Sequence, residues 1–389
     1  MPVINRIAEL SAEMTAWRRD LHENPELLFN LPRTSALVAE KLRAFGCDDV
    51  VTGIAQTGVV AVIRGRSNTT NRVIGLRADM DALPIMEAND LPYRSKVPGK
   101  MHACGHDGHT ASLLGAAQYL TETRNFDGTA VLVFQPAEEG AGGARVMVEE
   151  GLFERFGIQE IYGQHNAPNL PVGQFGMNTG GVMASMDAFT ITITGRGGHA
   201  ATPEKCIDPI LAGAHLITAL QSIIGRNVDP QKAGVISVCV FNAGDAFNVI
   251  PQTATLRGTV RALDADVRDQ LQERIVQVTN GVVTALGASV EIDYIRGYPV
   301  TVNHPDATAF AAEVAREIAG VGGVDTASPP HMGAEDFSFM LEKRPGAYIW
   351  FGNGASADLH HPSYNFNDDA LPFAASMLVR IIERRMPLK

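Results

Sequence analysis

The densest group of chemically capable side chains lies in residues 101–110, MHACGHDGHT, which hold three histidines, one cysteine and one aspartate. An apolar helical pattern follows directly. A helix N-terminus stabilises negative charge and lowers the pKa of a nearby thiol, and a metal ion binds cysteine as the thiolate. The glycine between Cys104 and His106 allows unusual backbone angles, so both side chains can turn toward one point. The segment therefore predicts a metal site; the alternative is a histidine-rich turn around a buried cysteine.

Two pairs of carboxylates follow predicted apolar strands. Glu138 and Glu139 stand in the segment FQPAEEG, where paired carboxylates are costly unless their charge is matched. One of them can bind a metal while the other moves protons, and a solvated turn is the alternative. Asp79 and Asp81 stand in the segment RADMDALP. These two would orient a histidine ligand or, alternatively, cap a helix.

Single histidines in two later segments gain meaning from these neighbours. His165 lies in GQHNAP after an apolar pair, and His360 lies in LHHPSY near the C-terminus. Taken singly, each would be interpreted as a structural or surface histidine. Together, a thiolate, imidazoles and a carboxylate are the usual ligands of zinc or manganese. Two metal ions need a bridging anion, and Cys104 is the natural bridge.

Two more polar positions lie in the middle of the chain. His199 stands in the glycine-rich segment TGRGGHAATP, whose glycines allow a tight loop that presents the imidazole. A purely structural role is the alternative for this histidine. Asn248 stands in FNVIP, just before a proline turn.

These polar segments sit among strands and helices that alternate along the chain. The alternation predicts an α/β fold with a doubly wound, mostly parallel sheet. In such sheets ligands bind at the carboxyl ends of the strands, which is where most of the polar segments fall. The predicted helices are 1–25, 34–45, 109–121, 306–319 and 370–385, and the predicted strands are 58–64, 72–78, 129–135 and 347–351.

Residues 185–297 follow a different order, strand–helix–strand–strand–helix–strand. This is the order of a ferredoxin-like α+β unit. We therefore expect 1–184 and 298–389 to form a catalytic metal-binding domain, with 185–297 inserted into it. The predicted strands of the insert are 187–194, 234–242, 253–262 and 289–296, and its predicted helices are 208–225 and 264–286.

The bulk composition limits the class of protein. The 389 residues are 45% apolar and 19% charged, which suits a globular chain of about two domains. A net charge of −11 argues against a nucleic-acid partner, because such proteins usually carry a basic patch. The four cysteines are scattered, and the polar N-terminal residues lead us to expect no secretion signal. No apolar run in the sequence reaches the length of about 18–20 residues that a membrane helix needs. The expected location is the cytoplasm, with no membrane partner.

Seven segments, in this order and spacing, resemble those of one protein family. The set resembles the amidohydrolase branch of the aminoacylase and carboxypeptidase G superfamily, which includes hippurate hydrolases, auxin-conjugate hydrolases and N-acetyl-diaminopimelate deacetylases. The resemblance extends over nearly the whole chain, from about residue 12 to 385. The segments are MHACGHDGHT, FQPAEEG, GQHNAP, GRGGHAATP, FNVIPQTATLRGTVR, MGAEDF and LHHPSYNFND.

The resemblance implies two divalent metal ions per subunit. Manganese or zinc is expected and nickel or cobalt is an alternative, because a soft thiolate favours zinc whereas relatives often work with manganese. The chain departs from the wider superfamily at two places that its own branch shares. Asp79-Met80-Asp81 replaces a His-x-Asp pair, and Cys104 replaces a bridging aspartate. The implied ligands are Cys104 as the bridge, His106 and His165 on one metal, and Glu139 and His360 on the other.

The resemblance also implies hydrolysis of the amide bond of small N-acyl amino acids by a metal-activated water, with Glu138 as general base. The insert would be a lid and dimerisation domain in a homodimer or higher homo-oligomer. Its His199 would reach the active site of the partner subunit and stabilise the oxyanion, and Asn248 would help to hold the substrate. The released amino acid carries a carboxylate, for which Arg257 and Arg261 are candidate clamps.

Three other hypotheses fit the same residues. A dipeptidase or carboxypeptidase could use this site on a different substrate. A thiol protease would use Cys104 with His106 and would not need a metal. A non-catalytic binding protein would have kept the fold alone, and the presence of every implied ligand argues against it.

Overall fold

The computed structural model describes residues 3–388, and contacts divide the chain into two compact units. Unit 1 comprises Met1–Gly180, Val302–Pro329 and Asp336–Lys389, and unit 2 comprises Gly181–Thr301 and Pro330–Glu335. The expected insert, 185–297, lies wholly within unit 2. No helix among residues 3–388 combines the length and the apolar character needed to cross a bilayer.

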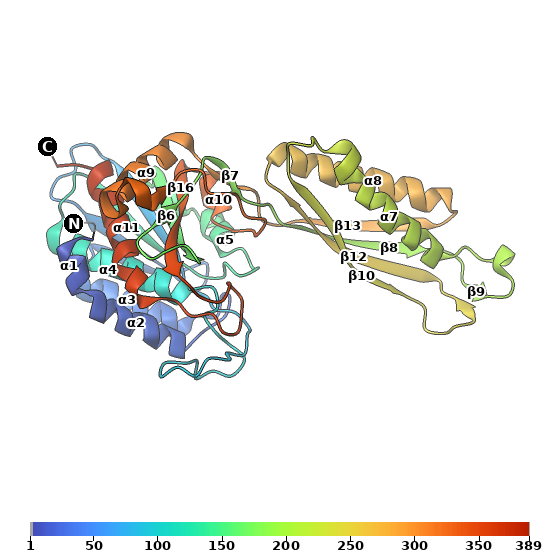
Figure 1. Cartoon of the computed structure of the whole chain (residues 1–389), viewed down its shortest axis with the longest axis horizontal. Helices are drawn as coiled ribbons and strands as arrows, with labels where there is room; N and C mark the ends of the chain where they lie inside the picture. The colour runs from blue at the N-terminus through green and yellow to red at the C-terminus, as the bar shows by residue number, and fades with distance from the viewer. Residues whose placement is uncertain (1–2, 389) are drawn as a thin grey trace. The chain divides into compact units, whose positions relative to one another are not determined.

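An eight-stranded sheet forms the centre of unit 1, and Figure 1 labels two of its strands, β16 and β6. The strand order is β1-β2-β4-β3-β5-β16-β6-β15, which ends with the short strands β6 (Phe175–Gly176) and β15 (Val324–Asp325). The four neighbours β4 (Thr129–Gln135), β3 (Val73–Asp79), β5 (Glu160–Pro168) and β16 (Gly346–Gly354) run parallel. β1 (Asp49–Ile54) and β2 (Gly58–Arg64) add to β4 as an antiparallel hairpin, because only a short turn joins them. The predicted mixed α/β class with a large, parallel-centred sheet is confirmed.

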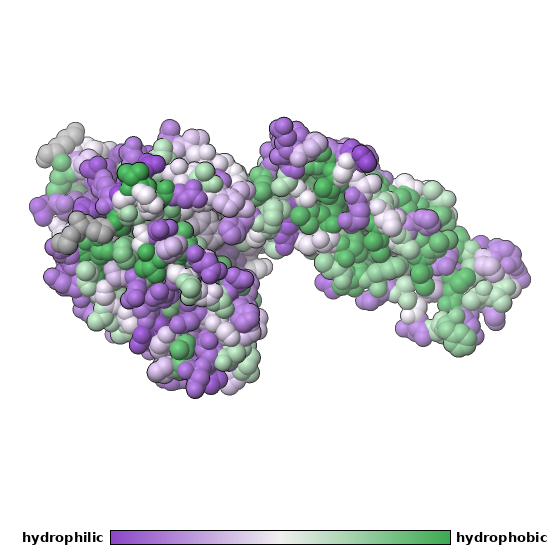
Figure 2. All heavy atoms as spheres, viewed as in Figure 1, coloured by the Kyte–Doolittle hydropathy of each residue, from purple (hydrophilic) through white to green (hydrophobic). Residues whose placement is uncertain are grey.

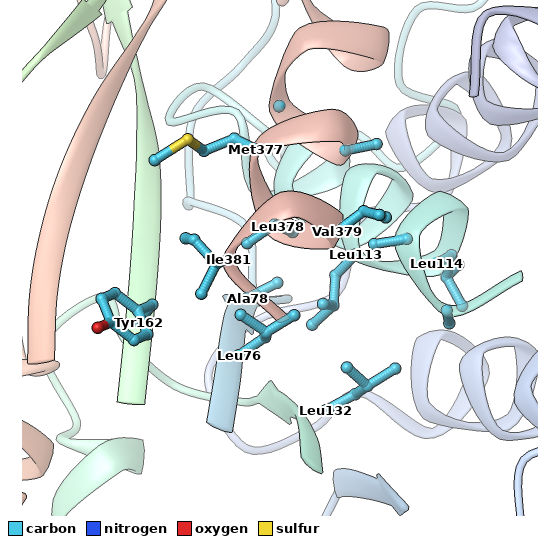
Figure 3. Close-up of a cluster of buried hydrophobic side chains, with 14 of the residues drawn as sticks. Leu76, Ala78, Leu113, Leu114, Leu132, Tyr162, Met377, Leu378, Val379 and Ile381 are labelled. Atoms are coloured by element: carbon cyan, nitrogen blue, oxygen red, sulfur yellow. The ribbon is translucent and has the colours of Figure 1, made fainter. Parts of the chain in front are cut away.

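Both faces of this sheet are covered. Leu76 points toward α4 (His106–Thr123) and α11 (Leu371–Arg385), where Leu113 and Leu378 lie in the buried cluster (Figure 3). On the opposite face the Arg77 guanidinium lies 5.5 Å from the ring centroid of Phe337, the residue just before α10 (Ser338–Leu341). Because helices and loops cover both faces of the sheet, nearly every residue of these strands is buried, and their sequences are therefore almost continuously apolar.

The N-terminal helices pack closely against α4. Gly115 has no room for a side chain, since a Cβ there would lie 2.2 Å from Sδ of Met14 on α2 (Ser11–Glu23). The sequence predicted one helix over 1–25, but a turn at Leu10 separates α1 (Asn5–Glu9) from α2. The close approach at Gly115 brings the last turns of α2 toward the start of α4, where the candidate metal ligands begin.

Unit 2 contains the β-α-β-β-α-β order that the sequence predicts, and its four strands form an antiparallel sheet in the order β10-β12-β8-β13. Two helices pack on one face of this sheet through a separate apolar core that includes Ile191, Leu216 and Ile275. Side chains of Asp208 and Asp264 cap the two helices by accepting hydrogen bonds from their first N–H groups. The elements are β8 (Asp187–Thr194), α7 (Pro209–Asn227), β10 (Gly234–Ala243), β12 (Thr253–Ala262), α8 (Ala265–Ala285) and β13 (Ser289–Arg296).

One expected boundary near the candidate site is wrong. The helix predicted from 109 begins at His106, directly after Gly105, whose φ of 93° is not helical; its first turn is polar, so the apolar periodicity could not mark it. His165 lies inside β5, a strand for which no bounds were predicted from the sequence. The remaining elements are α3 (Pro32–Phe45), α5 (Gly143–Glu149), α6 (Leu152–Phe156), β7 (Gly180–Met183), β9 (Gly198–His199), β11 (Val249–Ile250), β14 (Thr301–Asn303) and α9 (Pro305–Ala319).

Candidate metal centre

Gly105 shapes the turn that presents Cys104 and His106. Its φ is 93°, and a Cβ at this position would lie 2.3 Å from Oδ1 of Asn166. No other residue type meets both conditions without strain. The turn leaves the buried Cys104 just before α4 and His106 as the first helical residue. The sulfur of Cys104 then lies 3.4 Å from Nε2 of His165.

Each of the buried candidate ligands His106 and His165 keeps one ring nitrogen for a metal ion. His106 Nδ1 donates to the backbone oxygen of Asp81 at 2.8 Å, and its Nε2 is buried without a hydrogen-bond partner among the described residues. His165 Nδ1 lies 2.8 Å from the backbone oxygen of Asn166, which leaves Nε2 turned to Cys104. A backbone acceptor on one nitrogen is the usual way in which a metal-binding imidazole is oriented.

Asp81 also fixes the turn after β4. Its two carboxylate oxygens accept hydrogen bonds from the backbone N–H groups of Glu138, at 2.9 Å, and Glu139, at 3.1 Å. The turn contains Ala137 with a φ of 56°, a conformation that non-glycine residues rarely adopt and that recurs at functional sites. Oε1 of Glu139 lies 3.4 Å from Nε2 of His360, and it has no hydrogen bond within the described part of the chain.

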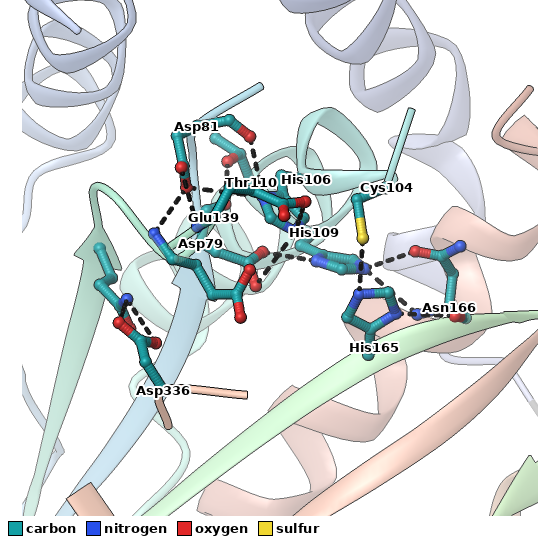
Figure 4. Close-up of polar contacts among 12 residues, drawn as sticks. Asp79, Asp81, Cys104, His106, His109, Thr110, Glu139, His165, Asn166 and Asp336 are labelled. Atoms are coloured by element: carbon teal, nitrogen blue, oxygen red, sulfur yellow. Dashed lines mark hydrogen bonds and ion pairs between the residues drawn. The ribbon is translucent and has the colours of Figure 1, made fainter. Parts of the chain in front are cut away.

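Cys104 belongs to two groups of candidate ligands at once. Its sulfur lies within 4.8 Å of the ligand atoms of His106 and His165, and within 4.8 Å of those of Glu139 and His360. Figure 4 shows Cys104, His106, His165 and Glu139 gathered around one region. Within residues 3–388, His106 Nε2 and Glu139 Oε1 are buried and make no hydrogen bond, so both atoms are available to bind a cation. The donor set therefore fits two divalent cations that share the sulfur.

A layer of buried side chains stands behind these candidates. Both ring nitrogens of His109 are engaged, Nδ1 with Asp79 at 2.5 Å and Nε2 with Asn166 Oδ1 at 2.7 Å. His109 is therefore a support and has no nitrogen to offer a metal. Asp79 Oδ2 also accepts a hydrogen bond from Nη1 of Arg77 at 2.8 Å, and Nδ2 of Asn166 donates one to Tyr364 Oη at 2.6 Å. Sequence reasoning missed Arg77, His109 and Asn166, although a charged residue within an apolar strand was a signal for Arg77.

The protonation of the candidate ligands differs from the sequence-based expectation. Burial and the carboxylates of Glu139 and Glu138 raise the pKa of the Cys104 thiol well above its usual value. The expected lowering by the helix N-terminus is wrong for the metal-free site, since burial and like charge outweigh it. For His106, burial lowers the pKa but the surrounding carboxylates, above all Asp79, outweigh it and raise the pKa to about 10.

These pKa shifts predict that cations compete with protons for the site. Near neutral pH the metal-free protein holds a proton on the Cys104 thiol and one on the His106 ring that a bound cation must displace. Metal affinity should therefore fall steeply as the pH is lowered, and loading should release protons. Titration calorimetry of zinc into chelated protein, repeated in buffers of different ionisation enthalpy, measures this release. Binding without net proton release would contradict the assignment.

The four remaining candidate residues lie in unit 2. His199 in β9 pairs with Val249 in β11, and the N–H of Ala200 donates to the backbone oxygen of Asn248 at 3.1 Å. The structure thus brings His199 and Asn248 together on one exposed loop pair. Arg257 is exposed on β12. Arg261 on the same strand is half-buried and donates to Thr259 Oγ1 and to the backbone oxygen of Val260, so its guanidinium is already engaged.

Comparisons with known proteins agree with this geometry. The sequence profile described as Peptidase family M20/M25/M40 matches residues 75–384. The hippurate hydrolase of Campylobacter jejuni is 46% identical over 381 residues, which cover 98% of each chain. The N-acetylcysteine deacetylase of Bacillus subtilis is 40% identical, with 94% of each chain covered. The crystal structure of the Bacillus subtilis YxeP protein, a dinuclear metal-binding peptidase, is similar with a TM-score of 0.86, 35% identity, and 97% and 99% of the two chains covered.

The chain is therefore a hydrolase-type α/β protein that belongs to peptidase family M20/M25/M40. This confirms the resemblance noted from the seven segments. It also argues against the non-catalytic hypothesis, since the relatives named here are enzymes that hydrolyse their substrates.

Proposed function

We propose that this chain is a dinuclear metal-dependent amidohydrolase that cleaves the amide bond of small N-acyl amino acids. The observation that carries the proposal is the position of the Cys104 sulfur. It lies within 4.8 Å of the ligand atoms of His106 and His165, and also within 4.8 Å of those of Glu139 and His360. Relatives at 46% and 40% identity, a hippurate hydrolase and an N-acetylcysteine deacetylase, support this substrate class.

Glu138 is the general base in this proposal. Its carboxylate is buried, and an oxygen of it lies within 4.8 Å of the ligand atoms of His106 and Glu139. When bound, two cations supply Lewis acidity and lower the pKa of a water from 15.7 to about 7. Glu138 would accept a proton from the water that attacks the carbonyl and would then deliver this proton to the leaving amine. Asp81 holds the backbone of both glutamates and so keeps Glu138 in place.

The residues of unit 2 bind the substrate and its oxyanion. His199 of one subunit stabilises the oxyanion in the site of its partner, as a positioned donor does in other acyl-transfer sites. Asn248, which lies beside His199, helps to hold the substrate. Of the two candidate arginines, the exposed Arg257 is the better clamp for the substrate carboxylate, because Arg261 already donates within its own strand.

A substrate panel on chelated protein tests this function. N-acetyl, N-benzoyl and indole-acetyl amino acids, together with dipeptides, are assayed with zinc, manganese, nickel or cobalt added back singly. We expect turnover of the N-acyl amino acids that vanishes on chelation and returns with metal. Turnover of dipeptides alone would favour the peptidase hypothesis, which the M20 relative of known structure keeps open. Full activity without metal would favour a thiol protease, although Cys104 contacts His165 rather than His106.

A homodimer through unit 2 completes the proposal. The exposed side of α7 presents small and apolar residues such as Leu211, Ala214 and Thr218, and Figure 2 shows apolar residues spread over this part of unit 2. A hollow of about 410 Å³ lies between α7 and α8. β10 is an edge strand, with no partner on its outer side among the described residues. An open edge and an apolar helix face suit a second copy of the chain.

Substituting Ala214→Arg should break this dimer. A buried, unpaired charge at the centre of a self-complementary face is repeated on both copies and opposes association. Light scattering after gel filtration should show a shift from dimer to monomer. Gln277→Arg on α8 is the exposed control and should leave the dimer intact; an unchanged mass for Ala214→Arg would contradict this interface.

The four free cysteines support a reducing compartment, and we propose the cytoplasm.

A further inference from the structure

A cluster of buried charges lies where the end of α2 meets the start of α4. Arg18 and His22, one helical turn apart on α2, have side chains with no solvent exposure. Asp107, the neighbour of His106 in the chain, is equally buried and faces both. None of these three is a candidate metal ligand. We call Arg18 and His22 the anchor pair.

His22 contacts two segments that both lie far from it in the sequence, one around Glu87 and one around Asp107. Its Nδ1 lies 2.8 Å from the carboxylate of Asp107, and its Nε2 lies 3.3 Å from that of Glu87. Burial lowers the pKa of His22, but the hydrogen bonds to Asp107 and Glu87 outweigh it and raise the pKa to about 9. The ring is therefore doubly protonated at neutral pH and donates from both nitrogens.

Arg18 makes a second connection, to the loop that carries His360. This loop, residues 355–367, is called the His360 loop and lies between β16 and the short helix that begins at Asp368. Its Nη1 lies 3.5 Å from Asp107, and its Nε donates to Asp368 at 2.7 Å. The guanidinium also stacks on the ring of Tyr93 at 4.4 Å. One side chain thus spans from the residue after His106 to the C-terminal end of the His360 loop.

The segment around Glu87 contacts the middle of the same loop. Glu87 accepts the backbone N–H of Ser95 at 2.7 Å. Asn89 donates to the backbone oxygen of Tyr364 at 2.8 Å, and the N–H of Ala88 donates to that of Pro362 at 2.9 Å. The anchor pair therefore reaches the His360 loop by two routes, through Asp368 and through the segment around Glu87.

We propose that Arg18 and His22 are positioning residues of the metal centre, which hold the Cys104–Asp107 turn and the His360 loop at a fixed separation. The inference rests on the proposed function. The turn supplies His106 to one candidate ligand group and the His360 loop supplies His360 to the other, while Cys104 of the turn belongs to both groups. A shift of the His360 loop relative to the turn would move His360 away from Glu139 and leave the His106–His165 group unchanged. The anchor pair thus acts chiefly on the second cation site.

Cobalt binding to the full-length, metal-free protein tests this role without relying on activity. Cobalt bound by a thiolate gives a charge-transfer band, so a titration followed by absorbance resolves two binding events. Arg18→Lys keeps the buried positive charge but loses the planar fork that spans two carboxylates. We expect one event to stay unchanged and the other to weaken by about 10- to 100-fold, the range for residues that orient ligands. Arg18→Met should show the same effect more strongly.

Arg19→Met is the matched control. Arg19 contacts the same Asp368 and the same Tyr93 ring, but it is exposed and does not reach Asp107. We expect wild-type cobalt binding for this variant. His22→Gln, which can keep only one of the two hydrogen bonds, should weaken the same event as Arg18→Lys, and circular dichroism checks that each variant is folded.

The outcomes separate the two proposals. Two equally strong cobalt events in a folded Arg18→Lys protein, even with a lowered melting temperature, would overturn the positioning role. Equal weakening of both events would also overturn it, because the anchor pair would then be a general stabilising element. Wild-type protein that binds no cobalt through a thiolate would instead overturn the proposed function.

Discussion

Glu138→Gln should lower kcat by about 10²- to 10⁴-fold, the usual contribution of general acid–base catalysis. The amide keeps the size of the side chain but cannot accept the proton of the attacking water. The backbone N–H of residue 138 still donates to Asp81, so the turn should keep its shape. Steady-state kinetics on N-acyl amino acids, with elemental analysis of the same sample, measure both halves of the prediction.

Glu139→Gln is the paired variant, because the two glutamates are adjacent and share Asp81. Glu139 is the candidate ligand next to His360, so its variant should lose bound metal together with activity. Glu138→Gln with full metal content and near-normal turnover would remove Glu138 from the mechanism. Loss of metal in both variants alike would mean that the two carboxylates do not divide the roles as proposed.

Mixed dimers should recover activity from two inactive parents if His199 acts across the dimer. His199→Ala removes an oxyanion donor and should lower kcat by about 10²- to 10³-fold. In a dimer of one Glu138→Gln chain and one His199→Ala chain, one of the two sites is built entirely from unaltered residues. Differently tagged chains, co-expressed and purified through both tags, should therefore show about half the wild-type activity per dimer.

The reciprocal dimer is the control. A wild-type chain paired with a chain carrying both substitutions has one defect in each site if His199 acts across the dimer, and it should be inactive. If His199 serves its own subunit, the results reverse, so that the reciprocal dimer is half-active and the mixed dimer is inactive. The two preparations contain the same substitutions, and differences in folding cannot explain such a reversal.

The sequence predicted the elements of both units well where the pattern was apolar. Period-two alternation of apolar residues marked β8, and β-branched runs marked β2 and β4 within a residue of their bounds. Local ligand density marked Cys104 and His106, whose spacing across Gly105 is a short-range feature. The placement of His165 and His360 beside them followed from the family resemblance, because contacts between distant segments leave no local periodicity.

The supporting residues were not predictable in this way. From the sequence alone, charged residues on an amphipathic helix are expected to face the solvent. The side chains of Arg18 and His22 are fully buried in the structure. Their partner Asp107 was counted only as one of the polar residues near Cys104. Asn166 lies between His109 and Tyr364, three residues that meet only in the folded chain. Such buried polar networks depend on tertiary distances rather than on spacing along the chain.

Anomalous diffraction from cobalt-loaded crystals tests the shared cysteine most directly. The account predicts two metal peaks about 3.5–4 Å apart, each within about 2.3 Å of the Cys104 sulfur, one beside His106 and His165 and the other beside Glu139 and His360. A single peak, or two peaks of which only one touches the sulfur, would contradict the dinuclear centre.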